Sequence, residues 1–324
     1  MSQILEAPAG YKVRATVRKH KLEIRNAYAA YVAEGRLEVV ELTDLVHEHF
    51  PPSWFEGVDA VMHVASPLAG RETPEKMLET AVEGTLNIVR QAEAAGIRKF
   101  VVTSSIASLG NPTEPALSAK SWNPITREIA LKSNNAMIVY LASKTLAERA
   151  LWEFADSHPH LDVATINPVF LYGPFSKTQE APADSTAMAT NAFFYHMLYL
   201  TGGVPSAAAH VDVRDAARAH VLALKTLPTE PGSIRKRFPI SSPNPLRWRD
   251  VVQLIRNQRP GLAERLTKVD VSAADSGPAR LIVEFDRLES ILGFRQNEFR
   301  SLEDTVLAAV DGVVEAEKRW NSRL

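Results

Sequence analysis

Tyr140 and Lys144 are four residues apart and have the chemistry needed for proton transfer. On a helix, residues at this spacing emerge from the same face, one turn apart. An ammonium group beside a phenol favours the phenolate and so lowers the phenol's pKa. The pair therefore predicts a tyrosine that serves as a general acid or base near neutral pH. The alternative is an exposed helix in which the spacing arises by chance.

Three hydroxyl residues, Thr103, Ser104 and Ser105, end the apolar run KFVVTSS, which has the composition of a buried strand. Ligands of parallel sheets bind at the carboxyl ends of the strands, where Ser105 could donate a hydrogen bond to a substrate carbonyl oxygen. The alternative is a serine that caps a turn or helix. For Ser104 we favour that structural role.

The elements that would position these residues alternate between strands and helices. Apolar runs predict strands, and longer segments with helical periodicity, such as Pro74–Ala95 and Tyr140–Phe154, separate them. The predicted strands are Tyr11–Val17, Leu37–Leu42, Ala60–Ala65, Phe100–Ser104 and Val163–Asn167. This order predicts an α/β fold with a doubly wound, Rossmann-like parallel sheet.

After Pro168 the alternation becomes less regular. Gly173–Thr190 is rich in Pro, Ser, Thr and Ala and is typical of a long loop over a site. A short strand at Pro239–Ser241 and helices near Arg247–Gln258 and Leu302–Trp320 indicate a smaller C-terminal substrate lobe. We predict a dinucleotide-binding domain over residues 1–168 and about 208–241. The substrate-binding lobe would comprise residues 169–207 and 242–324.

Composition limits the possible functions. The 324 residues carry 37 Lys and Arg against 38 Asp and Glu, so no overall charge favours a nucleic-acid or membrane partner. There is no cysteine, which excludes disulfides, thiolate metal sites and cysteine nucleophiles. The N-terminus has no secretory signal pattern, and the most apolar later stretch is too short to cross a bilayer. We expect a soluble, cytoplasmic protein.

Several motifs together resemble the extended short-chain dehydrogenase/reductase superfamily. They are VTSSIASLG, the Trp122-Asn123-Pro124 segment, YLASKTLAE, TINPVFLYGP and HVDVRDAARAHVLAL. The most similar branch is that of dihydroflavonol reductases, cinnamoyl-CoA reductases and fungal aldehyde or ketone reductases. The resemblance implies a catalytic triad of Ser105, Tyr140 and Lys144, in which Ser105 orients the carbonyl, Tyr140 protonates its oxygen and Lys144 also holds the nicotinamide ribose. The cofactor would supply the hydride.

The resemblance also implies where the cofactor binds. Asp44 and Leu45 would contact the adenine, and Val64, Ala65 and Ser66 would lie beside the ribose and phosphates. Thr103 would lie at the same edge of the sheet, and Pro168 and Val169 would face the nicotinamide amide. Asn87 falls where related enzymes place an asparagine that supports a proton relay, and a helix-packing role is the alternative.

Basic residues at the end of the first predicted strand favour NADP (NADPH) over NAD. The strand runs through Arg14 and ends in Arg18, Lys19, His20 and Lys21, whereas NAD-selective enzymes place a carboxylate there to bind the ribose 2′-hydroxyl. A guanidinium suits a phosphate. The resemblance assigns the 2′-phosphate contact to Arg18, with Lys19 beside it. A solvated basic turn is the alternative.

No metal site is predicted. The histidine pairs His47 and His49, and His158 and His160, have neither a carboxylate-rich setting nor a helical i, i+4 spacing.

The chain departs from this family at its start. A dinucleotide-binding unit opens with a strand, a glycine-rich turn and a helix whose N-terminus faces the pyrophosphate. Only Ser2–Gly10 precede the first predicted strand, and they resemble the tail of that helix. We expect the missing strand to lie between the strand carrying Arg18 and the strand carrying Ser105. Losing three charge-assisted bonds of roughly 1.5 kcal/mol each would weaken cofactor binding about a thousandfold.

Three functions follow from this sequence. The leading one is an NADP-dependent oxidoreductase that reduces an aldehyde or ketone to an alcohol, with activity impaired by the missing segment. The second is a non-catalytic relative that acts as a binding or dimerisation partner, and the third is an NAD-dependent epimerase or dehydratase. We expect a small carbonyl or alcohol substrate and a monomer or homodimer. Aromatic residues between Phe170 and Tyr195 suit a hydrophobic substrate, although a core role for Phe193–Leu200 is the simpler interpretation.

Overall fold

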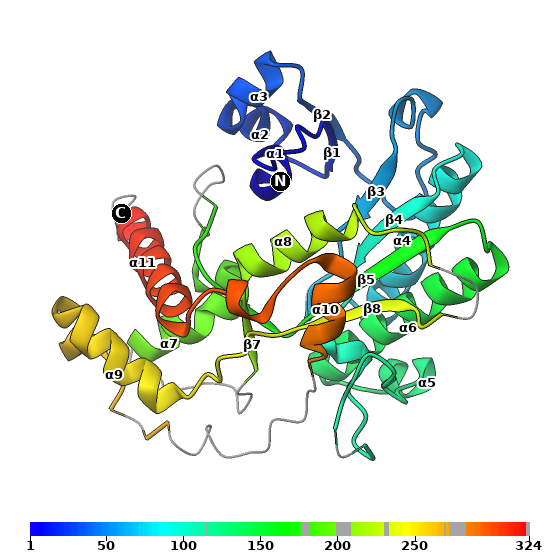
Figure 1. Cartoon of the computed structure of the whole chain (residues 1–324). Helices are drawn as coiled ribbons and strands as arrows, with labels where there is room; N and C mark the ends of the chain where they lie inside the picture. The colour runs from blue at the N-terminus through cyan, green and yellow to red at the C-terminus, as the bar shows by residue number, and fades with distance from the viewer. Residues whose placement is uncertain are drawn as a thin grey trace. The chain divides into compact units, whose positions relative to one another are not determined.

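Parallel strands alternate with helices through the first half of the chain, as the sequence predicts (Figure 1). The structure is a computed structural model, and it describes all residues except 71, 115, 177–181, 199–208, 230–232, 269, 272–282 and 322–324. The predicted α/β, Rossmann-like fold is confirmed by its similarity to solved reductase structures, which are described below.

The strands that the structure describes lie in three sheets. They are β1 (Val13–Val17), β2 (Leu37–Glu41), β3 (Ala60–His63), β4 (Lys99–Thr103), β5 (Asp162–Pro168), β6 (Phe170–Tyr172), β7 (His210–Asp212) and β8 (Lys236–Ile240). In the part of the chain that the structure describes, β1 pairs with β2, β6 pairs with β7, and the remaining strands form a four-stranded sheet in the order β3-β4-β5-β8.

The helices connect and cover these strands. They are α1 (Ser2–Leu5), α2 (Lys21–Ala27), α3 (Ala29–Ala33), α4 (Pro74–Ala94), α5 (Arg127–Leu131), α6 (Ala136–Ser157), α7 (Ala192–Leu198), α8 (Val213–Ala223), α9 (Trp248–Gln258), α10 (Phe285–Leu292) and α11 (Leu302–Asn321). None of the helices in the described ranges is long and apolar enough to cross a membrane.

The break between the first two sheets corrects one prediction. We expected the missing strand beside the strand that carries Ser105, which is β4. In the structure β4 pairs with β3 on one side and β5 on the other, so both sides of β4 already have a strand partner. Among the described residues, β3 is the edge strand of the four-stranded sheet on this side, and β1 pairs only with β2. The prediction was wrong because β3, although only four residues long, is the inner neighbour of β4.

Local sequence determines where the two long helices begin and end. Thr73 caps α4 by accepting a hydrogen bond from the Lys76 amide (3.4 Å), and Pro74 occupies the first turn, where its missing N–H costs nothing. Gly96 ends α4 at φ +88°, a conformation that favours glycine. Asn135 caps α6 in the same way through the Met137 amide (2.9 Å).

Helices α4 and α6 pack against each other and against the four-stranded sheet. The shared core is apolar and buried, so it holds the carboxyl ends of β3, β4 and β5 in fixed positions relative to α6. Its buried members are Val89, Ala92, Ile97, Phe100, Val102, Leu151, Trp152 and Val163.

The chain divides into two compact units. The first comprises Met1–Pro168, Arg218–Pro239 and Ile282–Phe294, and the second comprises Val169–Ala217, Ile240–Leu281 and Arg295–Leu324. The predicted domains share the break after Pro168 but differ at two later segments. The structure assigns His210–Ala217 to the second unit and α10 to the first.

Specific contacts explain these two differences. Strand β7 pairs with β6 instead of joining the four-stranded sheet, and Asp215 forms an ion pair with Arg300 (2.6 Å) inside the second unit. In the first unit, the Arg287 guanidinium on α10 donates hydrogen bonds to the backbone oxygens of Arg235 (2.6 Å) and Arg237 (2.7 Å). Such side-chain contacts leave no periodic signal in the sequence.

The second unit has its own core, in which several of the predicted pocket aromatics are buried. Tyr172 is 2% exposed and Phe194 is fully buried, and both pack edge-to-face on Trp248. The core interpretation of Phe193 and its neighbours is therefore the better one for the described residues. Part of the loop predicted over the site, residues 177–181, lies outside the described residues.

Candidate active site

Helix α6 brings Tyr140 and Lys144 to the carboxyl edge of the four-stranded sheet. Its buried face includes Val139, Ala142 and Ser143, which anchor the helix on both sides of Tyr140. Tyr140 is half-buried, and Lys144 is 7% exposed. The two side chains are thus held on one helix, one turn apart, with little freedom to move away from the sheet.

Ser105 lies opposite, immediately after β4. Its backbone is extended, and it caps the short 3₁₀ helix Ile106–Ser108, since its Oγ accepts a hydrogen bond from the Ala107 amide (3.2 Å). The capping role considered from the sequence is therefore real. The same hydroxyl also forms a hydrogen bond with the Tyr140 side chain. The structure brings Ser105, Tyr140 and Lys144 together.

Burial dominates the pKa values of these groups. It raises the pKa of Tyr140, and the hydrogen bond with Ser105 opposes this only in part. The prediction that Tyr140 has a lowered pKa is wrong in direction, because desolvation disfavours the phenolate. Burial lowers the pKa of Lys144 to about 8, although the negative charge of Glu148 raises it. Near neutral pH the site therefore holds a protonated phenol and a largely charged amine.

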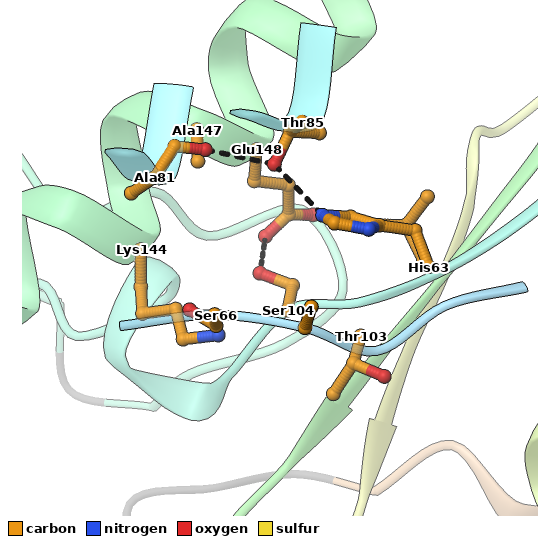
Figure 2. Close-up of a pocket in the computed structure, with 11 residues that line it drawn as sticks. His63, Ser66, Ala81, Thr85, Thr103, Ser104, Lys144, Ala147 and Glu148 are labelled. Carbon is orange, nitrogen blue, oxygen red and sulfur yellow. Dashed lines mark hydrogen bonds between the residues drawn. The ribbon is translucent and has the colours of Figure 1, made fainter. Parts of the chain in front are cut away.

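A cavity beside Lys144 is lined by polar groups from several elements. Figure 2 shows His63 and Ser66 from β3 and the following loop, Thr103 and Ser104 from the end of β4, and Lys144 on α6. His63 Nε2 lies 3.3 Å from Thr85 Oγ1. Burial, with a further contribution from the Lys144 charge, lowers the pKa of His63 to about 4. This histidine is neutral at physiological pH.

Ser104 has the structural role predicted for it, through a partner that the sequence analysis did not identify. Its hydroxyl donates to Glu148 Oε2 (2.6 Å), a carboxylate that is 3% exposed and that also forms a buried ion pair with Arg237 (2.7 Å). Glu148 lies four residues after Lys144 in YLASKTLAE, so the helical spacing that identified Tyr140 and Lys144 could have identified it as well.

The basic residues at the end of β1 differ in their surroundings. Arg14 forms an ion pair with Glu38 (2.6 Å) and donates to the backbone oxygens of Ser53 and Trp54, so its role is structural. Arg18 and Lys19 are exposed and have no hydrogen-bond or ion-pair partner in the described parts of the chain. Arg18 and Lys19 can therefore bind an added anion without losing an existing partner.

Asp44 and Leu45 stabilise the loop after β2. The Asp44 carboxylate accepts hydrogen bonds from the Val46 amide (2.8 Å) and from His47 Nδ1 (2.9 Å). The hydrogen bond from His47 is the main cause of an Asp44 pKa of about 2. Leu45 approaches α4 closely, and a side chain at Gly84 would meet it at 3.2 Å.

Asn87 serves this same loop. Its amide donates to the backbone oxygens of Leu45 (2.9 Å) and Glu48 (3.1 Å), and its own oxygen accepts a hydrogen bond from Gln91 (2.7 Å). All the hydrogen-bonding groups of the Asn87 side chain are used in packing α4 against the loop. This geometry favours the helix-packing alternative over the proton relay.

The other predicted cofactor residues lie at several strand ends. Val64, Ala65 and Ser66 form an exposed loop directly after β3, and Thr103 Oγ1 lies 2.6 Å from His220 Nε2. Pro168 ends β5 in the first unit, and Val169 begins the second unit; both are buried.

The histidine pairs have local partners. His47 contacts Asp44 and Glu79, His158 stacks on Phe154, and His160 forms a hydrogen bond with Glu93. Among the described residues, no group of three or more His, Asp or Glu side chains is arranged to hold a metal ion.

Comparison with known proteins identifies the family. The model of the NAD dependent epimerase/dehydratase family matches residues 6–234. This range includes most of the first unit. The chain belongs to this family. The resemblance to extended short-chain dehydrogenases/reductases predicted from the motifs is confirmed.

Curated relatives within this family are oxidoreductases. A Candida albicans protein that is provisionally named an NADPH-dependent methylglyoxal reductase, GRP2, is 30% identical over 96% of this chain and 94% of its own length. Cinnamoyl-CoA reductase 1 of Petunia hybrida is 33% identical over 67% of this chain and 62% of its own length.

Solved structures of the family share the fold. Yeast methylglyoxal/isovaleraldehyde reductase Gre2 complexed with NADPH superposes with a TM-score of 0.76 at 21% identity, covering 98% of this chain and 96% of its own. Candida albicans Gre2 in complex with NADPH gives a TM-score of 0.75 at 25% identity, over 97% of this chain and 94% of its own.

Proposed function

We propose that this chain is an NADP-dependent reductase that converts an aldehyde or ketone to an alcohol. The observation that carries the proposal is the hydrogen bond between Ser105 and Tyr140 beside the buried Lys144. Three groups that can orient a carbonyl, protonate its oxygen and stabilise the charge that develops there converge at one strand end. The names of the curated relatives, which include a methylglyoxal reductase, a cinnamoyl-CoA reductase and a ketoreductase, support a reductase.

Each residue has a distinct role in this proposal. The Ser105 hydroxyl donates to the substrate oxygen and fixes its position next to Tyr140. The Tyr140 phenol, whose pKa is raised by burial, remains protonated through the neutral range and gives its proton to the developing alkoxide. The charged Lys144 amine stabilises the phenolate left behind. When bound, the nicotinamide cofactor supplies the hydride.

The residues of the first unit fit the two ends of such a cofactor. Arg18 and Lys19 offer unpaired cations to a 2′-phosphate, and no carboxylate of the β1 end competes for that position. Lys144 and the cavity lined by Ser66 and Thr103 offer hydrogen-bonding groups to a ribose. Asp44 and Leu45, Val64 and Ala65, and Pro168 with Val169 would complete the contacts predicted from the family resemblance.

Fewer binding groups are available for the pyrophosphate in the middle of the cofactor. A pyrophosphate is usually held by backbone N–H groups of a glycine-rich turn at a helix N-terminus. Within residues 1–324 no closely spaced glycines follow a strand, and β1 and β3 lie in separate sheets in the described structure. We therefore propose that this 324-residue chain binds NADPH much more weakly than a relative that carries such a turn.

One titration tests both parts of the proposal. NADPH and NADH are titrated into this chain and into a version preceded by a family-like strand and glycine-rich turn, with fluorescence as the measurement. We expect NADPH to be preferred in both, with affinity at least about a hundredfold higher in the extended version. Equal NADPH affinities would refute the affinity proposal, and a preference for NADH would refute the assignment of Arg18.

A non-catalytic binding role is the second candidate. The separation of the β1–β2 pair from the four-stranded sheet favours it, because a strand edge with unpaired N–H and C=O groups can pair with another chain. The two candidates differ in one outcome. A reductase consumes NADPH when an aldehyde is added, whereas a binding partner leaves NADPH unchanged at any aldehyde concentration.

A further inference from the structure

One buried carboxylate, Glu148, accepts an unusual number of hydrogen bonds. Its Oε2 accepts from Ser104 Oγ (2.6 Å), Ser108 Oγ (2.5 Å) and Asn167 Nδ2 (2.8 Å). Its Oε1 accepts from Thr165 Oγ1 (3.0 Å), Arg237 Nε (2.7 Å) and Trp152 Nε1 (3.3 Å). These donors come from the β4–α6 connection, β5, β8 and α6 itself, so the carboxylate joins four segments of the first unit.

The charge of Glu148 is balanced inside the protein. Arg237 is 2% exposed, and its guanidinium also donates to the backbone oxygens of Ala119 (2.7 Å) and Ser121 (2.8 Å). The guanidinium carbon lies 3.7 Å from the centre of the Trp122 ring. Burial alone would raise the pKa of Glu148, but Arg237 and the hydroxyl donors outweigh it and hold the pKa below its usual value. Glu148 is therefore ionised.

Glu148 is connected to the Ser105 turn through the side chains of Ser108 and Asn167. Asn167 Nδ2, which donates to Glu148 Oε2, also lies 3.4 Å from the backbone oxygen of Ser105. Ser108 Oγ lies 2.5 Å from Glu148 Oε2 and 2.8 Å from the backbone oxygen of Ser105. Ser104, the residue before Ser105, is held by the same carboxylate oxygen. The Ser108 hydroxyl has one proton to share between these two oxygens, and with Ser104 on the same carboxylate the contacts restrain the turn in which Ser105 Oγ meets Tyr140.

Glu148 also lies one helical turn beyond Lys144. Both line the cavity in Figure 2, and the carboxylate's negative charge acts on the buried ammonium group. The other titratable groups near Lys144 are His63 on β3, which is neutral at physiological pH, and Tyr140 on α6. Glu148 is thus the buried negative charge that opposes the loss of the Lys144 proton.

We propose that Glu148 is a positioning residue for the reaction, which fixes the orientation of Ser105 through Ser108 and keeps Lys144 charged. This inference rests on the proposed function of Ser105, Tyr140 and Lys144. It goes beyond that function because it assigns a role to a residue outside the group of Ser105, Tyr140 and Lys144.

Two variants test the proposal, and a third is a matched control. Glu148→Gln removes the charge and replaces one acceptor with a donor, and Ser108→Ala removes the hydroxyl that contacts both Glu148 and the Ser105 backbone while leaving the carboxylate charge in place. The control is Asp162→Asn. Asp162 is also a buried carboxylate of the first unit, paired with Lys99 and Lys236, but it lies opposite Lys99 at the other end of β4.

The first measurement is amide hydrogen exchange of residues 104–109, which needs neither cofactor nor substrate. The amides of Ala107 and Ser108 bond to Ser105, so their exchange reports the order of this turn. We expect exchange at least about tenfold faster in Glu148→Gln and Ser108→Ala, and unchanged in Asp162→Asn. Equal exchange in all three variants would overturn the proposal. If Glu148→Gln fails to fold, the exchange rates of Ser108→Ala alone test the proposal.

The second measurement is steady-state reduction of an aldehyde. Since misplacing a catalytic group by about 1 Å costs about a hundredfold, we expect kcat to fall roughly tenfold to a hundredfold in Glu148→Gln and Ser108→Ala, with KM changed less than about threefold. The pH at which the rate declines should fall in Glu148→Gln only. A wild-type chain without turnover would refute the proposed function, and hydrogen exchange would still decide the inference. A normal kcat in both variants would refute the positioning role.

Discussion

Arg18→Ala should weaken binding of ligands that carry a 2′-phosphate and leave other adenine nucleotides unaffected. Arg18 is exposed at the end of β1 and has no partner among the described residues, so its guanidinium gives up no existing ion pair when a phosphate binds. A hydrogen bond between charged groups contributes about 1.5–3 kcal/mol. Loss of that interaction corresponds to about a tenfold to a hundredfold weaker affinity.

Calorimetric titration with 2′,5′-ADP and with AMP measures this difference without the nicotinamide end of the cofactor. Lys12→Ala is a matched control, because Lys12 is an exposed cation just before β1, about 20 Å from Arg18 along the extended chain. We expect Arg18→Ala to reduce affinity for 2′,5′-ADP alone and Lys12→Ala to change neither affinity. If Arg18→Ala left the ratio of the two affinities unchanged, the basic residues would form only a solvated turn.

Three further predictions concern pH and loop packing. Because the pKa of Lys144 is lowered to about 8, the rate of carbonyl reduction should decline as pH rises through about 8, and a pH–rate profile that stays flat to pH 10 would contradict this role. His63, with a pKa of about 4 in the folded protein against 6.5 when unfolded, binds a proton more readily in the unfolded chain between these values. Stability should therefore fall by up to about 3 kcal/mol as pH falls from 6.5 to 4, and His63→Gln should lose part of this dependence in urea unfolding. Asn87→Ala should reduce the free energy of unfolding by about 1–3 kcal/mol and raise the KM for NADPH more than it lowers kcat; a kcat loss with unchanged KM would instead indicate the proton relay.

Much of the fold could be predicted because periodicity is a local property of the sequence. The strands β1 to β5 and the helices α4 and α6 fall within a few residues of their predicted bounds. The neighbour of β4 was predicted wrongly because periodicity does not specify strand order. β3 is short, and only its pairing with β4, from Ala60 with Lys99 to His63 with Val102, shows that the two strands are neighbours.

The candidate site could be predicted in its principal residues but not in its supporting ones. The spacing of Tyr140 and Lys144 and the place of Ser105 at a strand end suggest these residues, and the family resemblance joins them into one site. The ion pair of Glu148 with Arg237 joins residues far apart in the sequence, so only the fold reveals it. The sequence analysis also did not predict that the pKa of Tyr140 is raised. Burial is the main cause, and it depends on how α6 packs and not on the nearby Lys144.

Consumption of NADPH on addition of an aldehyde, by this chain and by Tyr140→Phe, tests the proposed reaction most directly. NADPH is supplied at high concentration, because binding is expected to be weak. We predict that the wild-type chain forms one alcohol for each NADPH consumed and that Tyr140→Phe, folded to the same extent, is slower by about a hundredfold or more. A Tyr140→Phe variant as active as the wild type, or a wild-type chain that consumes no NADPH with any aldehyde or ketone tested, would contradict the proposed function.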